Sequence, residues 1–308
     1  MILKLGSKGE QVKILQEFLE LKPDGDFGPK TENAVKQWQA KNKLVADGIV
    51  GPATWNAMGI ASTDISESKG DNGKIEIKEY LLPTKEYLKG PTKKEFLFLH
   101  HTAGWHNPYD TVDQWGKDSR GQIATEFVLG GPSIKGDNYK FDGEIVKCIP
   151  DGGYGWHLGV NGSQKMHTNS VGIEVCNFGQ LTKGGYTKSG KFIAKNPNKY
   201  YNYVGIEADD TQVVILNKKF RGYDAWHRYS DEQIESLREL ILFIANRDSI
   251  DVRKGLVDLI KKVGVDAFEY NADAFNGRIR GMWTHTNTRR DKFDMFPQQE
   301  LIDMLLSL

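Results

Sequence analysis

The 308-residue sequence has no apolar run that approaches the roughly 20 residues of a membrane-spanning helix. It also has no excess of either charge, because Lys plus Arg and Asp plus Glu each total 41. General binding to nucleic acid or to acidic membranes requires a basic excess, so this balance argues against both classes. The N-terminus lacks the hydrophobic core of a signal peptide, and we therefore expect no N-terminal export signal.

Cysteine is scarce as well, with only Cys148 and Cys176, each inside a strand-like run. Neither has a Cys or His partner at the spacing of a zinc motif, which argues against both as metal ligands. We interpret them as buried free thiols, although the sequence leaves a disulfide between them open.

A motif that occurs twice organises the first 60 residues. The motif is Asp-Gly-x-x-Gly-Pro, at residues 24–29 and again at 47–52. It predicts a turn followed by a helix start, since glycine permits positive φ and proline suits the first helical turn. Residues 1–60 are therefore expected to form a small three-helix domain. Residues 61–73, rich in Ser, Asp and Gly, are predicted to be a flexible linker to a second domain over 74–308.

The second domain alternates strand-like and helix-like segments, which predicts an α/β fold with a mixed central sheet flanked by helices. A capping box at residues 230–233 precedes the clearest helical pattern of the chain. Residues 180–222 look like a long insertion with one strand. The expected strands are 95–102, 122–129, 144–150, 169–176 and 211–216, and the other expected helices are 252–263 and 298–306.

The most informative segment is Glu95–Thr102, an apolar run that ends in His100 and His101. It predicts a strand that is buried on both faces and has two imidazoles at its carboxyl end. Near the other end of the chain, His285 and Asp294 lie about one loop apart. Three protein ligands with one open position are typical of a catalytic zinc site. Alternation along the strand places His100 and His101 on opposite faces, so the pattern alone leaves the first ligand undecided.

The first domain resembles the peptidoglycan-binding domain family. The resemblance rests on Gly6-Ser7-Lys8-Gly9, on Leu15-Gln16 and on the two Asp-Gly turns. It implies binding to the glycan and the stem peptide of the bacterial cell wall.

The second domain resembles the zinc-dependent N-acetylmuramoyl-L-alanine amidases, whose superfamily includes phage lysozyme-type amidases and animal peptidoglycan recognition proteins. Four motifs in the same order carry the resemblance over roughly 200 residues. They are Leu99-His100-His101-Thr102-Ala103, Gly155-Trp156-His157-Leu158-Gly159, Asn169–Glu174, and Thr284-His285 followed by Lys292-Phe293-Asp294.

The resemblance implies one Zn²⁺ per chain, held by His100, His285 and Asp294, and it favours His100 over His101. It also implies that Glu174 is the general base and that Lys292 stabilises the oxyanion of the reaction. The alternatives are a structural salt bridge for Glu174 and an ordinary solvated lysine for Lys292.

Three further residues are expected to face the substrate: His157, Trp156 and Glu126. Where many family members have Tyr-His-Phe, this chain has Thr125-Glu126-Phe127, so Glu126 is also a second candidate for the base. The remaining histidines, His106, His167 and His227, fit no ligand spacing and are expected to be structural or surface groups.

The resemblance implies an enzyme that hydrolyses the amide bond between N-acetylmuramic acid and L-alanine in peptidoglycan. A wall-binding domain joined to an amidase predicts a monomeric, bacteriolytic phage endolysin. It would be made in the host cytoplasm and reach the wall with the help of a separate holin-type protein. The alternatives are a non-catalytic peptidoglycan receptor and a peptidase that cuts within the stem peptide.

Overall fold

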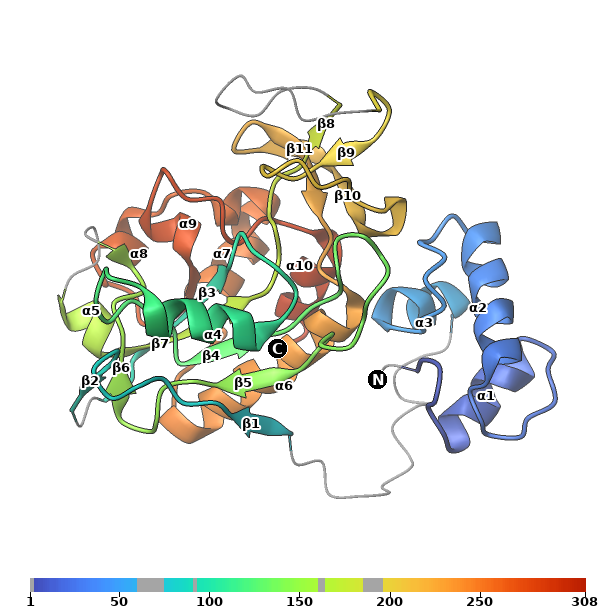
Figure 1. Ribbon diagram of the computed structural model, residues 1–308, viewed down its shortest axis with the longest axis horizontal. Coiled ribbons are helices and arrows are strands. Elements are labelled where there is room, and N and C mark those ends of the chain that lie inside the picture. The colour runs from blue at the N-terminus through green and yellow to red at the C-terminus, as the bar shows by residue number, and fades with distance from the viewer. Residues whose placement is uncertain (1–2, 60–74, 91–92, 160–163, 185–195) are drawn as a thin grey trace. The chain divides into compact units, whose positions relative to one another are not determined.

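The computed structural model describes residues 3–59, 75–90, 93–159, 164–184 and 196–308 (Figure 1). The chain divides into two compact units, residues 1–74 and 75–308. The predicted linker, residues 61–73, lies outside the described residues. The predicted fold class is confirmed: a helical N-terminal unit precedes an α/β unit with a mixed central sheet.

The N-terminal unit contains three helices: α1 (Glu10–Phe18), α2 (Pro29–Lys41) and α3 (Pro52–Met58). The turns before α2 and α3 contain Gly25 and Gly48, with φ of 72° and 79°, which a residue with a side chain adopts only under strain. The small core consists of Leu3, Val12, Leu15, Phe27, Val35, Val50, Trp55 and Met58.

The repeated motif has an identical hydrogen-bond network in both copies, built around a buried glutamine of the preceding helix. The glutamine accepts a bond from the turn glycine N–H and donates to the turn aspartate. The bonds are Gly25 N to Gln16 Oε1 at 2.9 Å and Gln16 Nε2 to Asp24 Oδ1 at 2.7 Å, repeated as Gly48 N to Gln39 Oε1 at 2.9 Å and Gln39 Nε2 to Asp47 Oδ1 at 2.8 Å. The sequence repeat is therefore a structural repeat.

The second unit is built on a six-stranded sheet with the order β1-β5-β4-β7-β3-β12. All neighbouring strands are parallel except the pair β4 and β5. Every residue of β3 is buried, as its unbroken apolar run predicted. The strands are β1 (Ile77–Glu79), β3 (Phe96–His101), β4 (Phe127–Leu129), β5 (Ile145–Lys147), β7 (Ser170–Val175) and β12 (Gly281–Thr284).

Helices cover both faces of this sheet (Figure 1). On one face, Val112 of α4 (Pro108–Lys117) belongs to the same apolar cluster as Val128 of β4. On the other face, Leu237 of α6 (Asp231–Asp248) clusters with the neighbouring residues of β4, Phe127 and Leu129. The helices α7 (Leu256–Val263) and α10 (Gln299–Leu306) contribute to this second cluster.

The shorter elements lie around this framework. They are β2 (Leu88–Lys89), β6 (Gly153–Tyr154), α5 (Gln164–Thr168), β8 (Thr182–Lys183), β9 (Tyr200–Tyr201), η2 (Asp210–Gln212), β10 (Val213–Phe220), β11 (Tyr223–His227), η3 (Gly264–Phe268), α8 (Ala272–Phe275) and α9 (His285–Thr288).

Some element boundaries differ from those expected. The strand expected at 122–129 is reduced to β4, residues 127–129. The helix expected at 252–263 begins only at Leu256, because Gly255, with φ of 87°, precedes its first turn. The single strand expected at 211–216 is β10, which pairs with β11 just after the insertion, and the insertion also contains the paired strands β8 and β9. The polar Asn217-Lys218-Lys219 stretch of β10 weakens the strand pattern.

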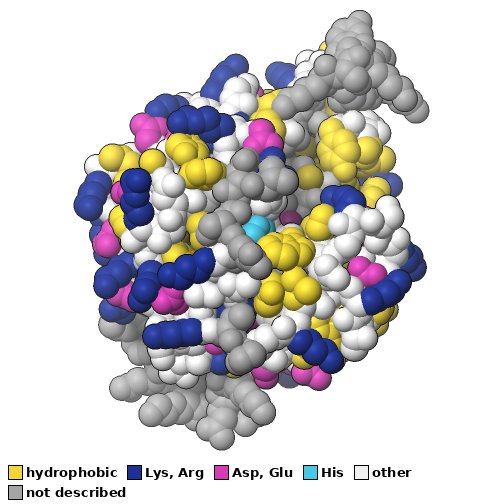
Figure 2. All heavy atoms as spheres, turned by 90° about the vertical axis from the view of Figure 1, so that its left-hand side faces the viewer, with side chains coloured by type: hydrophobic (Ala, Val, Ile, Leu, Met, Phe, Trp, Pro, Cys, Tyr) yellow, Lys and Arg dark blue, Asp and Glu magenta, His cyan; other side chains and the backbone are white. Residues whose placement is uncertain are grey.

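Two other expectations, the capping box of α6 and the free cysteines, are confirmed. The side chain of Ser230 caps α6, and Gln233 completes the capping box. Both cysteines are free and buried. None of the described helices combines the length and the apolar character that crossing a bilayer requires. Acidic and basic side chains are interspersed on the face shown in Figure 2, which fits the zero net charge.

Candidate functional site

The site begins at the carboxyl end of β3. His100 pairs in register with Glu174 of β7, and Glu174 in turn pairs with Val128 of β4. Register partners in a sheet present their side chains on the same face, so His100 and Glu174 share the face that α4 covers. His101 points to the opposite face, where its Nδ1 lies 2.8 Å from the Tyr229 hydroxyl. Packing across the sheet thus separates the two histidines that the sequence left as rivals.

The second part of the site follows β12. Thr284 pairs in register with Leu99 of β3 in a parallel arrangement. The next residue of each segment, His285 and His100, therefore lies at the same end of the sheet. Thr284 then begins the short helix α9 through a capping box with Asn287. The N–H of Thr286 donates to the carbonyl of Asp294 at 2.9 Å, which brings this loop back to the sheet edge.

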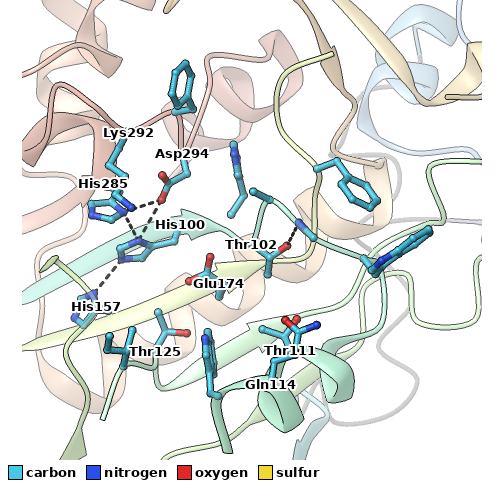
Figure 3. A pocket seen from close by; sticks show the side chains of 18 of the residues that line it. His100, Thr102, Thr111, Gln114, Thr125, His157, Glu174, His285, Lys292 and Asp294 are labelled. Carbon is cyan, nitrogen blue, oxygen red and sulfur yellow. Dashed lines mark hydrogen bonds and ion pairs between the residues drawn. The ribbon is translucent and has the colours of Figure 1, made fainter. Parts of the chain in front are cut away.

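Three side chains converge at this point, as Figure 3 shows. His100 Nδ1 lies 3.1 Å from His285 Nδ1 and 3.3 Å from Asp294 Oδ2. His285 Nδ1 lies 2.9 Å from the same carboxylate oxygen. All three residues are buried.

The charges of this cluster are shifted by burial and by mutual contact. Burial, reinforced by His285, lowers the pKa of His100 to about 4, so its ring is neutral at physiological pH. Burial alone would raise the pKa of Asp294, but His285 and His100 hold it well below its usual range. The cluster therefore presents a neutral imidazole and an ionised carboxylate.

This donor set fits a zinc ion. Two imidazole nitrogens and one carboxylate oxygen are accepted zinc ligands, and three of them leave a position open for water or substrate. The ligand atoms lie within 4.8 Å of one another, and the same side chains line a cavity of about 620 Å³. A metal bound here would therefore face a space that a substrate can enter.

Glu174 lines the same cavity, near the centre of the view in Figure 3. Burial raises the pKa of its carboxyl well above the usual range, and the charge of Asp294 adds to this shift while Lys292 opposes it. Within the described residues, the Glu174 carboxylate has no hydrogen-bond partner. Lys292 lines the cavity beside His285. The salt bridge considered for Glu174 is thus not found in the described part of the chain.

Glu126 has the structural partner that Glu174 lacks. Its carboxylate forms a two-pronged ion pair with Arg247 of α6, with the closer contact at 2.5 Å. Burial raises the pKa of Glu126, and Arg247 opposes that shift. Its neighbour Thr125 lines the cavity, but Glu126 is not among the described lining residues. We therefore correct the expectation that Glu126 faces the substrate.

The two aromatic residues expected to contact substrate differ in position. His157 lines the cavity directly behind His100. Trp156 instead packs edge-on against His167, with ring centroids 4.8 Å apart, and is not among the described lining residues. His157 also packs against His167, with ring centroids 5.9 Å apart, so both rings contact the same histidine but only His157 reaches the cavity.

The insertion supplies part of the cavity that the sequence did not reveal. Tyr203 and Val204, about half exposed at 51% and 55%, form one wall. They occupy a turn held by the fully buried Asn202, whose Oδ1 accepts bonds from Val204 N at 3.2 Å and Ile206 N at 2.8 Å. The Tyr203 hydroxyl donates to the carbonyl of Ala103 at 2.9 Å, three residues after His100. Asn followed by Gly205 signals a turn in the sequence, but not its place beside the cavity.

The remaining histidines lie outside the cluster. His227 is buried, and its Nδ1 accepts a bond from Phe178 N at 3.1 Å. His167 Nε2 contacts the Gly159 carbonyl at 3.1 Å, and burial lowers the pKa of His106. They have structural surroundings, as expected.

Two protein families match the chain. The family described as a putative peptidoglycan binding domain matches residues 8–58. The family described as N-acetylmuramoyl-L-alanine amidase matches residues 90–267. The second match ends before His285 and Asp294, so the structure itself, and not the family match, joins these residues to His100.

Individual relatives match over shorter stretches. The chain is 45% identical over 62 residues to a zinc D-Ala-D-Ala carboxypeptidase of Streptomyces albus G, covering 18% of this chain and 24% of that protein. It is 36% identical over 102 residues to the N-acetylmuramoyl-L-alanine amidase CwlL of Bacillus licheniformis, covering 30% and 28%. The chain thus spans about a quarter of the length of these curated relatives.

Among solved structures, the amidase LysC from Clostridium intestinale URNW is 14% identical, with a TM-score of 0.37, over 75% of this chain and 97% of that one. A Burkholderia AP3 phage endolysin is 40% identical over 20% of this chain and 25% of that chain, with a TM-score of 0.19. These likenesses are too weak to carry the assignment, which rests on the family matches. Because the amidase match covers more than half of the chain, the protein belongs to the N-acetylmuramoyl-L-alanine amidase family, with a peptidoglycan-binding domain ahead of the amidase domain.

Proposed function

We propose that this protein hydrolyses the amide bond between N-acetylmuramic acid and L-alanine in bacterial peptidoglycan, with zinc as its cofactor. One observation carries the proposal: His100, His285 and Asp294 converge beside a cavity that Glu174 also lines. Family membership supports the same reaction class.

In this proposal His100, His285 and Asp294 hold the metal. When bound, zinc supplies a Lewis acid that polarises the scissile carbonyl and lowers the pKa of water to about 7. Glu174 accepts the proton of the attacking water and passes it to the leaving amine of L-alanine. Its raised pKa suits a group that must take and release a proton near neutral pH.

Lys292 has the complementary role. Its side chain lines the cavity, two residues before Asp294 and next to His285. A fixed positive charge there stabilises the negative oxygen that develops on the substrate carbonyl. The cavity wall of Tyr203 and Val204 contacts the rest of the substrate.

The N-terminal unit keeps the enzyme on its polymeric substrate. Its match to the peptidoglycan-binding domain family supports binding to the cell wall. A wall-binding domain joined to an amidase domain supports a lytic role, in which a monomer acts on the wall after release by a holin-type protein. Tethering raises the local concentration of substrate without altering the chemistry.

Mass spectrometry of digested cell wall tests the bond that is cut. The amidase should produce new free L-alanine N-termini and glycan strands free of peptide. Cleavage products within the stem peptide would instead establish a peptidase, and intact wall would establish a non-catalytic receptor.

The metal is tested separately. The purified protein should contain about one zinc per chain, since three ligands hold one ion. Chelation should abolish wall lysis, and added zinc should restore it. Full activity of metal-free protein would refute the zinc mechanism.

A further inference from the structure

A chain of buried hydrogen bonds runs from His100 away from the proposed metal position. His100 Nε2 lies 3.0 Å from His157 Nδ1, and His157 Nε2 lies 2.7 Å from Ser170 Oγ. The Ser170 hydroxyl donates to the carbonyl of His167 at 3.4 Å. His100, His157 and Ser170 are 2%, 9% and 3% exposed, so little water competes for these bonds.

The proposed metal sets the direction of donation along this chain. A neutral imidazole that binds zinc through Nδ1 carries its proton on Nε2, so a metal-bound His100 donates to His157 Nδ1. His157 then carries its own proton on Nε2 and donates to Ser170 Oγ. The Ser170 proton in turn points to the carbonyl of His167, which can only accept.

This ordering leaves His100 Nδ1 without a proton, and that atom faces His285 and Asp294. A neutral imidazole binds a metal through its bare nitrogen, and a bond at its other nitrogen fixes both tautomer and ring orientation. We propose that His157 and Ser170 are positioning residues that lock His100 in its metal-binding tautomer. This inference rests on the proposed zinc site and gives His157 a role other than contact with substrate.

His285 offers an internal contrast. Its Nε2 is buried without a hydrogen-bond partner in the described residues, and its Nδ1 lies 2.9 Å from Asp294 Oδ2. In the described part of the chain, no hydrogen bond at Nε2 fixes the tautomer of His285. His100 is therefore the ligand that is arranged in advance.

The first test is the tautomer itself, read from imidazole ¹⁵N shifts in the metal-free full-length protein. We expect His100 and His157 both to carry their proton on Nε2. A His100 ring protonated on Nδ1 would overturn the proposal, whether or not the protein binds zinc.

The second test measures the zinc dissociation constant by competition with a chromophoric chelator. His157→Leu removes the acceptor, and should weaken zinc binding by about 10- to 100-fold, as for other partners of metal-bound histidines. His157→Asn places an amide oxygen near the Nδ1 position and should recover part of this loss. Ser170→Ala should weaken binding by less than His157→Leu.

The matched control is His227→Asn, the same substitution at a buried histidine away from the cluster, which should leave zinc affinity unchanged. Wild-type affinity in His157→Leu, or equal losses in His157→Leu and His157→Asn, would overturn the inference. Circular dichroism will show whether His157→Leu folds. If it does not, the zinc affinity of Ser170→Ala tests the inference instead, and an unchanged affinity in that variant would overturn it. Absence of zinc binding in the wild type would refute the proposed metal centre instead.

Discussion

Two carboxylates of the amidase unit, the partly buried Glu174 and the buried Glu126, have opposite surroundings. Glu174 faces the cavity without a hydrogen-bond partner in the described residues, whereas Glu126 is paired with Arg247. Desolvation raises the pKa of the unpaired Glu174 carboxyl, and such perturbed groups are typical of functional sites. We therefore propose Glu174 as the base and a stabilising role for Glu126 through its ion pair with Arg247.

The first prediction concerns Glu174→Gln, which keeps the shape of the side chain but removes the proton acceptor. The rate should fall by roughly 100-fold or more, as expected when general-base catalysis is lost. Zinc content and melting temperature should stay near the wild-type values. Turnover on a soluble muropeptide measures the effect, and an unchanged rate would show that another group takes the proton.

Glu126→Gln is the contrasting variant. It leaves the Arg247 guanidinium without its closest carboxylate, although Asp248 remains 2.6 Å away. We expect a loss of about 3 kcal/mol in the free energy of unfolding, near the lower end for a broken buried pair. The rate per folded molecule should change little. A rate loss as large as that of Glu174→Gln would move the base to Glu126.

The second prediction concerns acid stability and His227. Burial lowers its pKa from 6.5 to about 3, with His101 and His106 adding to the shift. Protonation would also turn Nδ1 from acceptor to donor and break the bond from Phe178 N. Between pH 6.5 and 3 the unfolded chain binds this proton and the folded chain does not. The contribution of neutral His227 to the free energy of unfolding is thus fully present above pH 6.5 and decreases as the pH falls below that value.

In this window, His227 should lower the free energy of unfolding by about 1.4 kcal/mol for each unit that the pH falls. His227→Asn keeps an acceptor near Nδ1 but cannot titrate, so its free energy of unfolding should depend less steeply on pH. Urea denaturation at pH 7, 6, 5 and 4 gives both slopes. Identical slopes would show that His227 is not protonated on unfolding in this range.

At the scale of elements, the N-terminal unit uses the same hydrogen-bond arrangement in two turns. Gln16 and Gln39 each bond the glycine N–H and the aspartate of the turn that follows their helix. Truncation leaves these turn groups unsatisfied, at a cost of about 1–3 kcal/mol for each buried group.

Gln39→Ala and Gln16→Ala should therefore each destabilise the N-terminal unit by about 3 kcal/mol, and by similar amounts because the networks are alike. Calorimetry of the full chain should show one shifted transition, with the amidase transition unchanged. The control is Lys43→Ala, which alters an exposed residue of the same unit. A clearly larger effect at one glutamine would mean that the two repeats are not equivalent in stability.

The turn that carries Tyr203 is the second element with a predicted effect. Tyr203 lies half exposed in the cavity wall, and apolar contact there should favour substrate binding. Tyr203→Ala should raise KM several-fold with kcat nearly unchanged. Tyr203→Phe removes only the bond to the Ala103 carbonyl and should have a smaller effect. A fall in kcat without a change in KM would place this turn in catalysis instead.

At the scale of the whole molecule, the two compact units divide binding from chemistry in our proposal. A fragment of residues 75–308 should fold and cleave small soluble muropeptides at the full-length rate. It should act more weakly on whole cell walls, because tethering raises the local substrate concentration only on a polymeric substrate. Equal losses on both substrates would mean that the N-terminal unit is part of the catalytic fold.

Local patterns in the sequence were sufficient for several parts of this molecule. The doubled Asp-Gly turn predicted the helical repeat, the capping box predicted the start of α6, and the apolar run before His100 predicted a strand buried on both faces. Each of these features depends on residues close together in the chain. The four ordered motifs likewise indicated the family from the sequence alone.

The residue pattern alone did not distinguish His100 from His101 or Glu174 from Glu126, whereas the tertiary structure brings His100 to His285 and Asp294 and pairs Glu126 with Arg247. A strand that is apolar on both faces has no alternating pattern, so nothing along the chain tells which face holds the cavity. That choice follows from α4 packing on one side and α6 on the other. The partners that give these residues their roles, Asp294 and Arg247, are more than a hundred positions distant, and only the folded sheet brings them into contact.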